Sequence, residues 1–351
     1  MQMSSERLVL SVDAMGGDHA PGSVLEGLQQ IAKEKLPLHV LLHGDDAQLS
    51  GFLKAHPDVA EICEIRHTDL AVAMDAKPGQ ALKARKGTSM CNMLESVKSG
   101  EARVAVSAGN TGALMAMSTF VLKRMPGIHR PALTAIWPTA KGSSVVLDVG
   151  ANIEADAEQL VEFAIMGSAY AKAVTGNNNP TIGLLNIGSE ELKGVESVRQ
   201  AADILKAGNI GLNYAGFVEG NDISMGTTDV VVTDGYTGNI ALKTAEGTAK
   251  LVGGFIRESL TSSLLSKIGA LLASGSLKQL KNRIDPNKAN GGVLLGVNGI
   301  VLKSHGGANA DGFATAMRIA FNVGKSQFIE DVEASLSKFH SEQPVIQETI
   351  S

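Results

Sequence analysis

One junction in the sequence places polar residues and glycines where they could hold an anion. In residues 229–247, DVVVTDGYTGNIALKTAEG, an apolar strand runs into a glycine turn that opens a helix. Backbone N–H groups at such a helix start, including that of Gly238, favour phosphate together with the positive end of the helix dipole. Asp234 could accept a proton from phosphate or orient it, and Asn239 could donate to an oxygen. Both residue types also form plain turns.

The chain repeats this arrangement twice. The sequence SAGNTGALMA, residues 107–116, follows the apolar strand 102–106, and four of its residues could wrap a phosphate: Ser107, Asn110, Thr111 and Gly112. Helix capping by Asn110 and Thr111 alone is the alternative. The sequence DAMGGDHAP, residues 13–21, follows the strand 8–12, and three of its residues are expected to shape the floor of a crevice: Asp13, Gly16 and Gly17. Three turns at the carboxyl ends of strands predict a ligand crevice along one edge of a parallel sheet.

The common catalytic signatures are missing from the sequence. It contains no GxSxG elbow, no GxGxxG fingerprint, no GxxxxGK[ST] loop and no HExxH pair. His39 and His43 could share one face of a strand, but core or surface histidines are the better interpretation, so no metal site is expected. The remaining interpretation is an enzyme that binds phosphate at glycine turns without a nucleotide-binding motif.

The composition favours a soluble enzyme and excludes several other classes. The chain has 351 residues, a net charge of −5 and only 4% aromatic residues, which argues against binding of nucleic acid. Cys63 and Cys91 have no CxxC spacing and are expected to be core thiols of a cytoplasmic protein. Neither a signal peptide nor an apolar run long enough to span a membrane is evident.

Strand and helix patterns alternate along most of the chain. Strands are expected at 8–12, 38–42, 60–66, 102–106, 133–137, 144–149, 181–186 and 230–232, and helices at 23–35, 46–55, 113–124 and 155–174. Residues 291–303 predict two short strands joined at Asn298 and Gly299. This order predicts a mostly parallel sheet with helices on both faces. We expect a single domain over residues 1–340 and a frayed polar tail over 341–351.

Residues 255–285 break this alternation with the pattern of two amphipathic helices, a helical hairpin inserted in the domain. Five positive charges, Arg257, Lys267, Lys278, Lys281 and Arg283, stand against Glu258 and Asp285, a balance of +3 in an acidic protein. Such a hairpin suits an anionic membrane or an acidic carrier protein, and an ordinary dimer or core helix pair is the alternative. The expected membrane contact is an apolar tip: Leu264, Leu265, Ile268, Leu271 and Leu272.

Six motifs, in order, resemble those of the bacterial acyl carrier protein:phosphate acyltransferase family of phospholipid synthesis. They are DAMGGDHAP, SAGNTGALMA, LDVGAN, NIGSEELKG, TDGYTGNIALKTAEG and LLGVNGIVLKSHGG, and they span about residues 8–310. Two positions depart from the family pattern. Phe is common at the position of Tyr236, and Ser is common at that of Gly307, which leaves any polar role at 307 open.

The resemblance implies transfer of a fatty acyl group from acyl carrier protein to inorganic phosphate, giving acyl phosphate. It implies a three-layer α/β/α fold like that of the isocitrate dehydrogenase and phosphotransacetylase group, and a homodimer. It also implies no metal or nucleotide cofactor and peripheral contact with the membrane, where a glycerol-phosphate acyltransferase consumes the product. Because phosphate is itself the nucleophile, no serine or cysteine nucleophile is needed.

With this chemistry in view, two further residues become candidates. Lys193, in NIGSEELKG, could support phosphate or the oxyanion, or be a solvated surface lysine. His305, in KSHGG, could protonate the leaving thiolate or only cap a turn. Three other functions stay open: an acyl-coenzyme A enzyme of the phosphotransacetylase kind, a metal-dependent dehydrogenase on the same fold, and a non-catalytic membrane-associated scaffold.

Overall fold

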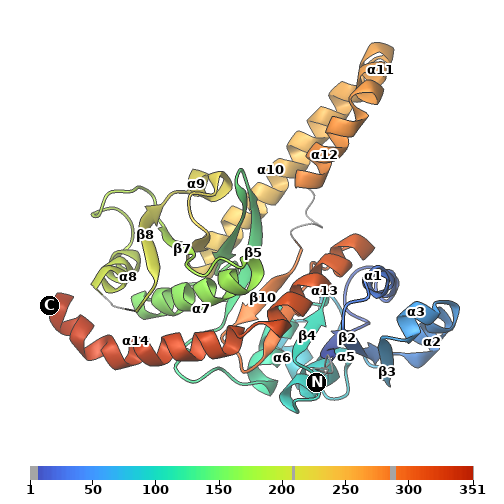
Figure 1. The fold of residues 1–351 in the computed structure, drawn as a ribbon, viewed down its shortest axis with the longest axis horizontal. Coiled ribbons are helices and arrows are strands. Elements are labelled where there is room, and N and C mark those ends of the chain that lie inside the picture. The colour runs from blue at the N-terminus through green and yellow to red at the C-terminus, as the bar shows by residue number, and fades with distance from the viewer. Residues whose placement is uncertain (1–6, 208–209, 285–289, 351) are drawn as a thin grey trace, which may run out of the picture.

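The computed structural model describes residues 7–207, 210–284 and 290–350, with the backbone alone for 280–284 and 342–350. Asp285 of the predicted hairpin therefore lies outside the described residues, as do the side chains of Leu280, Lys281, Arg283 and Ile284. One sheet of eleven strands runs through the molecule in the order β3-β2-β1-β4-β11-β10-β5-β6-β9-β7-β8 (Figure 1).

Two blocks of parallel strands make up most of this sheet. The first contains β3 (Cys63–His67), β2 (Leu38–Gly44), β1 (Leu8–Asp13), β4 (Val104–Ser107) and β11 (Ile300–Lys303). The second contains β6 (Gly142–Leu147), β9 (Val230–Val232), β7 (Thr181–Leu185) and β8 (Asn213–Val218). Between them, β10 (Gly292–Leu295) pairs antiparallel with β11 and with β5 (Ala132–Thr139), and β5 pairs antiparallel with β6.

Three antiparallel pairings in succession make the two blocks run in opposite directions. The turns after β1 and β4 lie at one carboxyl edge, whereas the turn after β9 belongs to the opposed block. The expectation that all three turns share one edge of a parallel sheet is therefore wrong. The sequence could not reveal this, because strand direction depends on long-range pairing.

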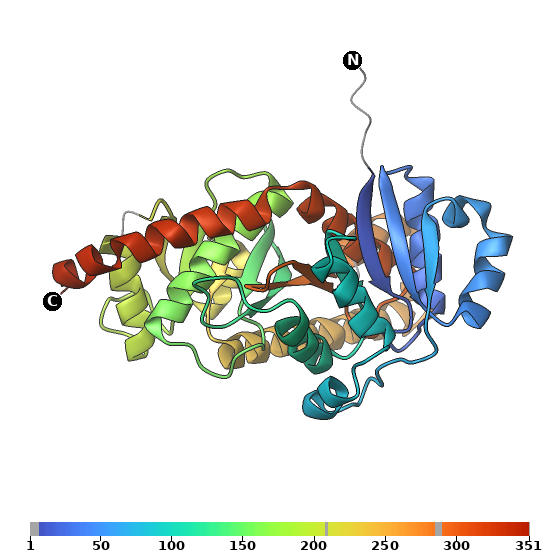
Figure 2. The ribbon, with the colours of Figure 1, turned by 90° about the horizontal axis from the view of Figure 1, so that it is seen from below.

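Helices cover both faces of the sheet, so the predicted three-layer α/β/α architecture is confirmed (Figure 2). One face carries α1 (Gly22–Lys33), α13 (Ala310–Lys325), α7 (Ala157–Thr175), α8 (Glu196–Ala207) and α14 (Phe328–Ile350). The other face carries α5 (Ser89–Lys98), α6 (Thr111–Val121), α9 (Gly220–Met225) and the start of α10 (Gly235–Thr261). Three short helices, α2 (Asp46–Ala55), α3 (Pro57–Ala60) and α4 (Pro78–Lys83), complete the first half of the chain.

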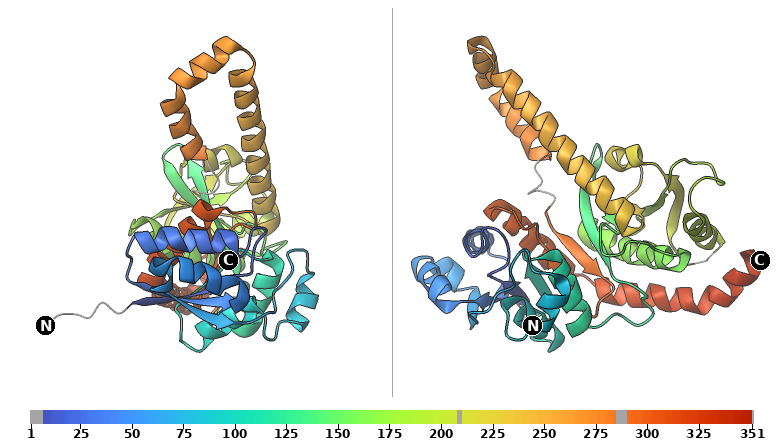
Figure 3. Two further views of the ribbon diagram at one scale, coloured as in Figure 1. Left: turned by 90° about the vertical axis from the view of Figure 1, so that its right-hand side faces the viewer. Right: turned by 180° about the vertical axis from the view of Figure 1, so that it is seen from behind.

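The predicted helical hairpin projects from the body of the molecule (Figures 1 and 3). It is built from the long helix α10, the short helix α11 (Leu264–Leu272) and α12 (Ser274–Ile284). Among the described residues, no helix has both the length and the apolarity to cross a membrane. At the other end of the chain, the residues after His340, expected as a frayed tail, continue α14 as a helix to Ile350.

Candidate active site

Three polar residues form a row across neighbouring strands at the carboxyl edge of the first block. Asp13 ends β1 and pairs in register with Ser107 at the end of β4, and Ser107 pairs with Lys303 at the end of β11. All three side chains are buried. Because adjacent parallel strands end together, the sheet itself brings these residues side by side.

The carboxylate of Asp13 is held by hydroxyl groups. Ser89 donates to its Oδ1 and Ser107 to its Oδ2, each at 2.7 Å. Burial raises the pKa of Asp13, and these two hydrogen bonds oppose the rise because they favour the charged form. Ser107 also accepts a hydrogen bond from the backbone of Gly109 at 2.9 Å. Its hydroxyl is thus committed to positioning the SAGNTG turn and does not project from it.

Lys303 is a residue of this site that the sequence reasoning missed. Its ammonium donates to the backbone oxygen of Ala108 at 3.3 Å, within the SAGNTG turn, and to that of Ser304. Burial lowers the pKa of Lys303 to about 8, and Asp13 and Asp18 oppose this fall. A lysine ending the apolar strand GIVLK was the available signal, because a charge there must find partners at the edge of the sheet.

The glycines of the first turn allow three loops to meet above this row. A β-carbon on Gly16 would lie 2.5 Å from Oδ2 of Asp13 and 2.7 Å from the backbone nitrogen of Gly109. Gly17 has a φ of 115° and lies against the backbone oxygen of Gly306, which also accepts from the N–H of Asp18 at 2.9 Å. The loops after β1, β4 and β11 therefore meet at this edge of the sheet, and a role of Asp13, Gly16 and Gly17 in shaping a ligand crevice stays a prediction.

The SAGNTG turn ends in a capped helix with free donors. Asn110 is the N-cap of α6, and its Oδ1 accepts from the N–H of Ala113 at 2.9 Å. Its Nδ2 donates to the backbone oxygens of Met74 and Ala76, which fastens the preceding loop over the turn. Among the described residues, the N–H groups of Thr111 and Gly112 have no acceptor. Capping by Asn110 is thus observed, and the open backbone donors are those of Thr111 and Gly112.

His305 follows Lys303 by two residues at the same edge. Its Nδ1 accepts a hydrogen bond from the backbone of Gly307 at 3.1 Å, so the local turn predicted for this residue is present. Burial lowers the pKa of His305, and the positive charges of Lys303 and Lys243 lower it further. With Nδ1 acting as an acceptor, the proton of the neutral ring is carried by Nε2.

The turn after β9 is built differently. Asp234 is the N-cap of α10, and it accepts from the N–H and the hydroxyl of Thr237, both at 2.8 Å. A β-carbon on Gly235 would lie 2.6 Å from Oδ2 of Asp148, and one on Gly238 would meet the backbone oxygen of the same residue. The helix begins at Gly235, and its first turn rests directly on the loop after β6. The N–H of Gly238, predicted as a donor to phosphate, donates instead to the backbone oxygen of Asp234 at 3.0 Å.

Asp148 holds that loop. Its buried carboxylate accepts five hydrogen bonds, from the backbone N–H groups of Leu133, Gly150, Ala151 and Asn152 and from the side chain of Asn152. Burial raises the pKa of Asp148, and these donors oppose the rise. Asn239 is exposed and lies next to Gly150 of this loop.

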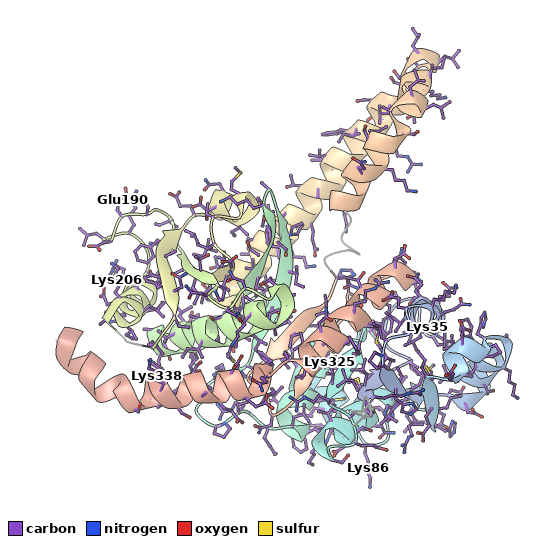
Figure 4. All side chains as sticks on the ribbon, in the orientation of Figure 1. Lys35, Lys86, Glu190, Lys206, Lys325 and Lys338 are labelled. Carbon is purple, nitrogen blue, oxygen red and sulfur yellow. The ribbon has the colours of Figure 1, made fainter. Side chains whose placement is uncertain are left out.

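Lys193 is not brought to either turn by its contacts. It lies in the segment after β7, is half exposed, and forms an ion pair with Glu190 at 2.9 Å. Figure 4 shows Glu190 at the outer end of the molecule, beside β8. The described contacts of Lys193 therefore match the solvated surface lysine that was the alternative for this residue.

A cleft of about 880 Å³ links the two regions. Gly112 at the start of α6 lines it on one side, and Ala151 and Asn152 from the Asp148 loop line it on the other. Its remaining lining is mostly apolar, including Leu82, Met115, Phe120, Pro131 and Leu294. An apolar cleft that ends at free backbone donors can hold a chain with a charged or reactive end.

The remaining candidates for other chemistries lie apart from this cleft. His43 is buried and its Nε2 lies 2.9 Å from the hydroxyl of Ser11, while His39 pairs with Glu64. In the part of the chain that the structure describes, no three His, Cys, Asp or Glu side chains are grouped to hold a metal ion. Cys63 and Cys91 are buried core thiols, and burial raises the pKa of both.

Sequence comparisons relate the chain to one protein family over most of its length. The profile of the family described as "Fatty acid synthesis protein" matches residues 8–331. The chain is 55% identical over 335 residues to a phosphate acyltransferase of Maricaulis maris, covering 95% of each chain. It is 53% identical over 334 residues to a phosphate acyltransferase of Caulobacter vibrioides, covering 95% of this chain and 93% of the other.

Solved structures show the same fold at much lower sequence identity. A phosphotransacetylase from Streptococcus pyogenes matches with a TM-score of 0.61 and 18% identity, covering 92% of this chain and 94% of the other. One from Staphylococcus aureus matches with a TM-score of 0.60 and 15% identity, covering 92% and 96%. The predicted relation to the phosphotransacetylase fold is confirmed.

Proposed function

The chain belongs to the fatty acid synthesis protein family, and we propose that it transfers a fatty acyl group from the thioester of acyl carrier protein to inorganic phosphate, forming acyl phosphate. The name of its relatives, phosphate acyltransferase, supports an acyltransferase that uses phosphate. The carrier-protein donor and the acyl phosphate product are the parts that we propose.

The observation that carries the proposal is the free start of α6 above the buried row of Asp13, Ser107 and Lys303. The N–H groups of Thr111 and Gly112 have no acceptor among the described residues, and they point from a helix start that favours an anion. Phosphate bound there would also be attracted by the buried charge of Lys303, whose ammonium donates to the backbone oxygen of Ala108 in the same turn. Ser107 would act as a positioning residue because its hydroxyl is already engaged.

In the proposed reaction, an oxygen of phosphate attacks the carbonyl carbon of the thioester, and the carbonyl oxygen becomes an oxyanion. Collapse of this intermediate breaks the carbon–sulfur bond and releases the carrier thiolate. The proton lost by phosphate passes to the thiolate, so the products are acyl phosphate and a free thiol. Backbone donors at the two turns would stabilise the oxyanion, which needs no nucleophilic side chain.

Side chains at the two turns would then serve phosphate and the leaving group. His305, neutral because its pKa is lowered by burial, could pass its Nε2 proton to the thiolate. Asp234 and Asn239 would face phosphate from the second turn, with Asn239 as the exposed donor. We give Lys193 no part, because its ion pair with Glu190 lies away from both turns.

The test is to incubate the protein with an acyl carrier protein thioester and phosphate and to trap acyl phosphate with hydroxylamine. Formation of hydroxamate that requires both phosphate and the protein, above the direct reaction of hydroxylamine with the thioester, and a much lower kcat/KM for acyl-coenzyme A support the proposal. Preference for short acyl-coenzyme A would instead favour an enzyme of the phosphotransacetylase kind. Absence of product from both donors would refute acyl transfer to phosphate.

We also propose that the hairpin tip binds membranes reversibly. Five apolar side chains of α11 are between 58% and 84% exposed: Leu264, Leu265, Ile268, Leu271 and Leu272. Lys267 adds a positive charge beside them, which suits an anionic surface. The double variant Leu264→Glu with Leu271→Glu should no longer sediment with anionic vesicles. A matched pair on the exposed loop after β7, Ile187→Glu with Leu192→Glu, should sediment as the wild type does.

We propose that a second copy of the chain packs against the part of α10 that precedes the hairpin tip. Leu251, Val252 and Phe255 of α10 are 47% to 58% exposed and lie within five residues of one another, too far down the helix to join the tip. An exposed apolar stripe on a long helix is typical of an oligomer interface. Sedimentation velocity of a Leu251→Glu, Phe255→Glu variant tests this: a dimer that persists would contradict it.

A further inference from the structure

One stretch of the chain carries a charge opposite to that of the whole. Residues 76–147 contain ten Lys and Arg and only two acidic residues, Glu95 and Glu101, a balance of +8. The full chain has a net charge of −5, so the remaining residues together carry −13. A positive balance of this size in one segment of an acidic protein, larger than the +3 of the helical hairpin, favours a surface for an anionic partner.

Part of this charge gathers around one exposed aromatic ring. Phe120, near the end of α6, is 45% exposed. The guanidinium carbon of Arg85 lies 3.9 Å from the centre of its ring, and the ammonium of Lys123 lies 4.9 Å from it. These cation–π contacts hold two positive groups beside an apolar anchor. Helix α4 packs against α6, and Lys77, Lys83 and Lys86 lie at or close to the ends of α4. We call Lys77, Lys83, Arg85, Lys86, Phe120 and Lys123 the Phe120 surface.

The cations of the Phe120 surface are available to a partner. In the described part of the chain, none of its five Lys and Arg side chains has a carboxylate within 4.0 Å. By contrast, Lys172, Lys193, Lys206 and Lys243, which lie elsewhere, each form an ion pair. An anionic partner would meet charges that no internal carboxylate neutralises.

The Phe120 surface is continuous with the cleft of the candidate active site. Phe120 and Lys123 line that cleft, and so does Gly112 at the start of α6. Leu82 of α4 and Met115 of α6 are also in its lining. An apolar arm that enters beside Phe120 can therefore reach the free N–H groups of the SAGNTG turn.

We propose that the Phe120 surface docks an acidic carrier protein and that the adjoining cleft receives its acyl thioester arm. This inference rests on the proposed function, because it assigns the donor a binding surface on this chain. The cations would attract the acidic carrier, Phe120 would provide an apolar contact, and the arm would deliver the thioester carbonyl to the start of α6. In this assignment the helical hairpin does not bind the carrier protein; it contacts the membrane and the second copy of the chain.

The test is charge reversal at two exposed lysines that do not line the cleft, in the variant Lys83→Glu with Lys86→Glu. The measured quantity is the ratio of kcat/KM for the carrier thioester to kcat/KM for a carrier-free acyl thioester of the same chain length. We expect this ratio to fall by at least about tenfold, since rim charges govern encounter with a charged partner. The matched control is Lys54→Glu on α2 with Lys338→Glu on α14, both exposed, and its ratio should stay at the wild-type value. Lys338 lies far from Lys86 in Figure 4.

A ratio unchanged in Lys83→Glu, Lys86→Glu, while the wild type makes acyl phosphate, would overturn the docking surface and leave the proposed function standing. If the wild type makes no acyl phosphate, the proposed function fails instead. Fluorescence anisotropy of labelled unacylated carrier protein then still tests the surface, since binding lost only in this variant supports it. Binding of anionic vesicles, and not of the carrier, through these lysines would also overturn it.

Discussion

Two buried aspartates end strands in the two opposed blocks of the sheet, and they are held in different ways. Asp13 accepts from the hydroxyls of Ser89 and Ser107 and from a single backbone N–H, that of Met15 at 3.2 Å, and it lies near the ammonium of Lys303. Asp148 accepts from four backbone N–H groups and one side-chain amide. Burial raises the pKa of both. Hydroxyls can rotate and a lysine can lose its proton, whereas backbone donors cannot change.

The surroundings of Asp13 can change with the protonation of Lys303, whereas most donors around Asp148 are fixed backbone groups that hold the loop after β6. Near Asp13, loss of the Lys303 proton would weaken its hydrogen bond to the backbone oxygen of Ala108, which belongs to the SAGNTG turn. Near Asp148, the carboxylate fixes a loop against which Gly235 and Gly238 pack. We therefore expect loss of the Asp148 carboxylate to affect stability first, and loss of the Lys303 charge to affect catalysis and its dependence on pH.

The largest effect should come from Asp148→Ala. It removes the acceptor of five donors, and each buried donor left unsatisfied costs about 1 to 3 kcal/mol, partly relieved by entering water. We expect the free energy of unfolding to fall by about 4 kcal/mol, measured by chemical denaturation. The control is Asp156→Ala, which removes only the exposed N-cap of α7 and should cost about 1 kcal/mol. Equal losses for the two variants would show that Asp148 is not a support.

His43 should make the first block sensitive to acid. It pairs in register with Asp13, and burial lowers its pKa from 6.5 to about 4, helped by the positive charge of Arg66. Between these two values the unfolded chain binds a proton that the folded chain does not, so stability is complete above pH 6.5 and falls as the pH drops toward 4. The loss should reach roughly 3 kcal/mol.

The variant His43→Gln isolates this effect, because Asp13, Asp148 and Glu162, whose pKa values are raised by burial, titrate in wild type and variant alike. The free energy of unfolding of each protein is measured from pH 7 to pH 4. The difference between them should shrink or change sign across that range by about the 3 kcal/mol given above. A difference that does not depend on pH would show that His43 is already charged in the folded protein.

The sequence was sufficient to predict where the strands end and the turns begin. It was insufficient to predict the strand directions and long-range contacts that place the turns relative to one another. The strand ends at Asp13 and Ser107 and the turn at Asp234 could be predicted because hydrophobic runs and glycines are local signals. The opposed direction of the second block could not, since it depends on the antiparallel pairing of β10, β5 and β6. Lys303 was missed because its contact with the SAGNTG turn, at the backbone oxygen of Ala108, joins positions 195 residues apart.

Lys303→Met tests whether the first region responds to charge. Loss of an interaction with a charged group costs about 1.5 to 3 kcal/mol, so acyl phosphate formation should fall roughly ten- to hundredfold. In the wild type, the rate at limiting phosphate should fall as the pH rises through about 8, where Lys303 loses its proton. In Lys303→Arg this fall should disappear, because arginine keeps its charge. An unchanged pH profile in Lys303→Arg would assign the fall to another group.

The smallest effects should come from substitution of Asn110 and Asn239, one in each turn. The two variants should differ in whether stability changes together with the KM for phosphate. Asn110 caps α6 and fastens the loop at Met74 and Ala76, so Asn110→Ala should lower the free energy of unfolding by about 1 kcal/mol as well as raise the KM for phosphate. Asn239 is exposed and makes no hydrogen bond within the described residues, so Asn239→Ala should leave stability unchanged and raise only the KM for phosphate. Denaturation curves and initial rates at low phosphate are measured for both. If Asn239→Ala keeps the wild-type KM, phosphate is bound by the first turn alone, and the second region supports the cleft without touching the substrate.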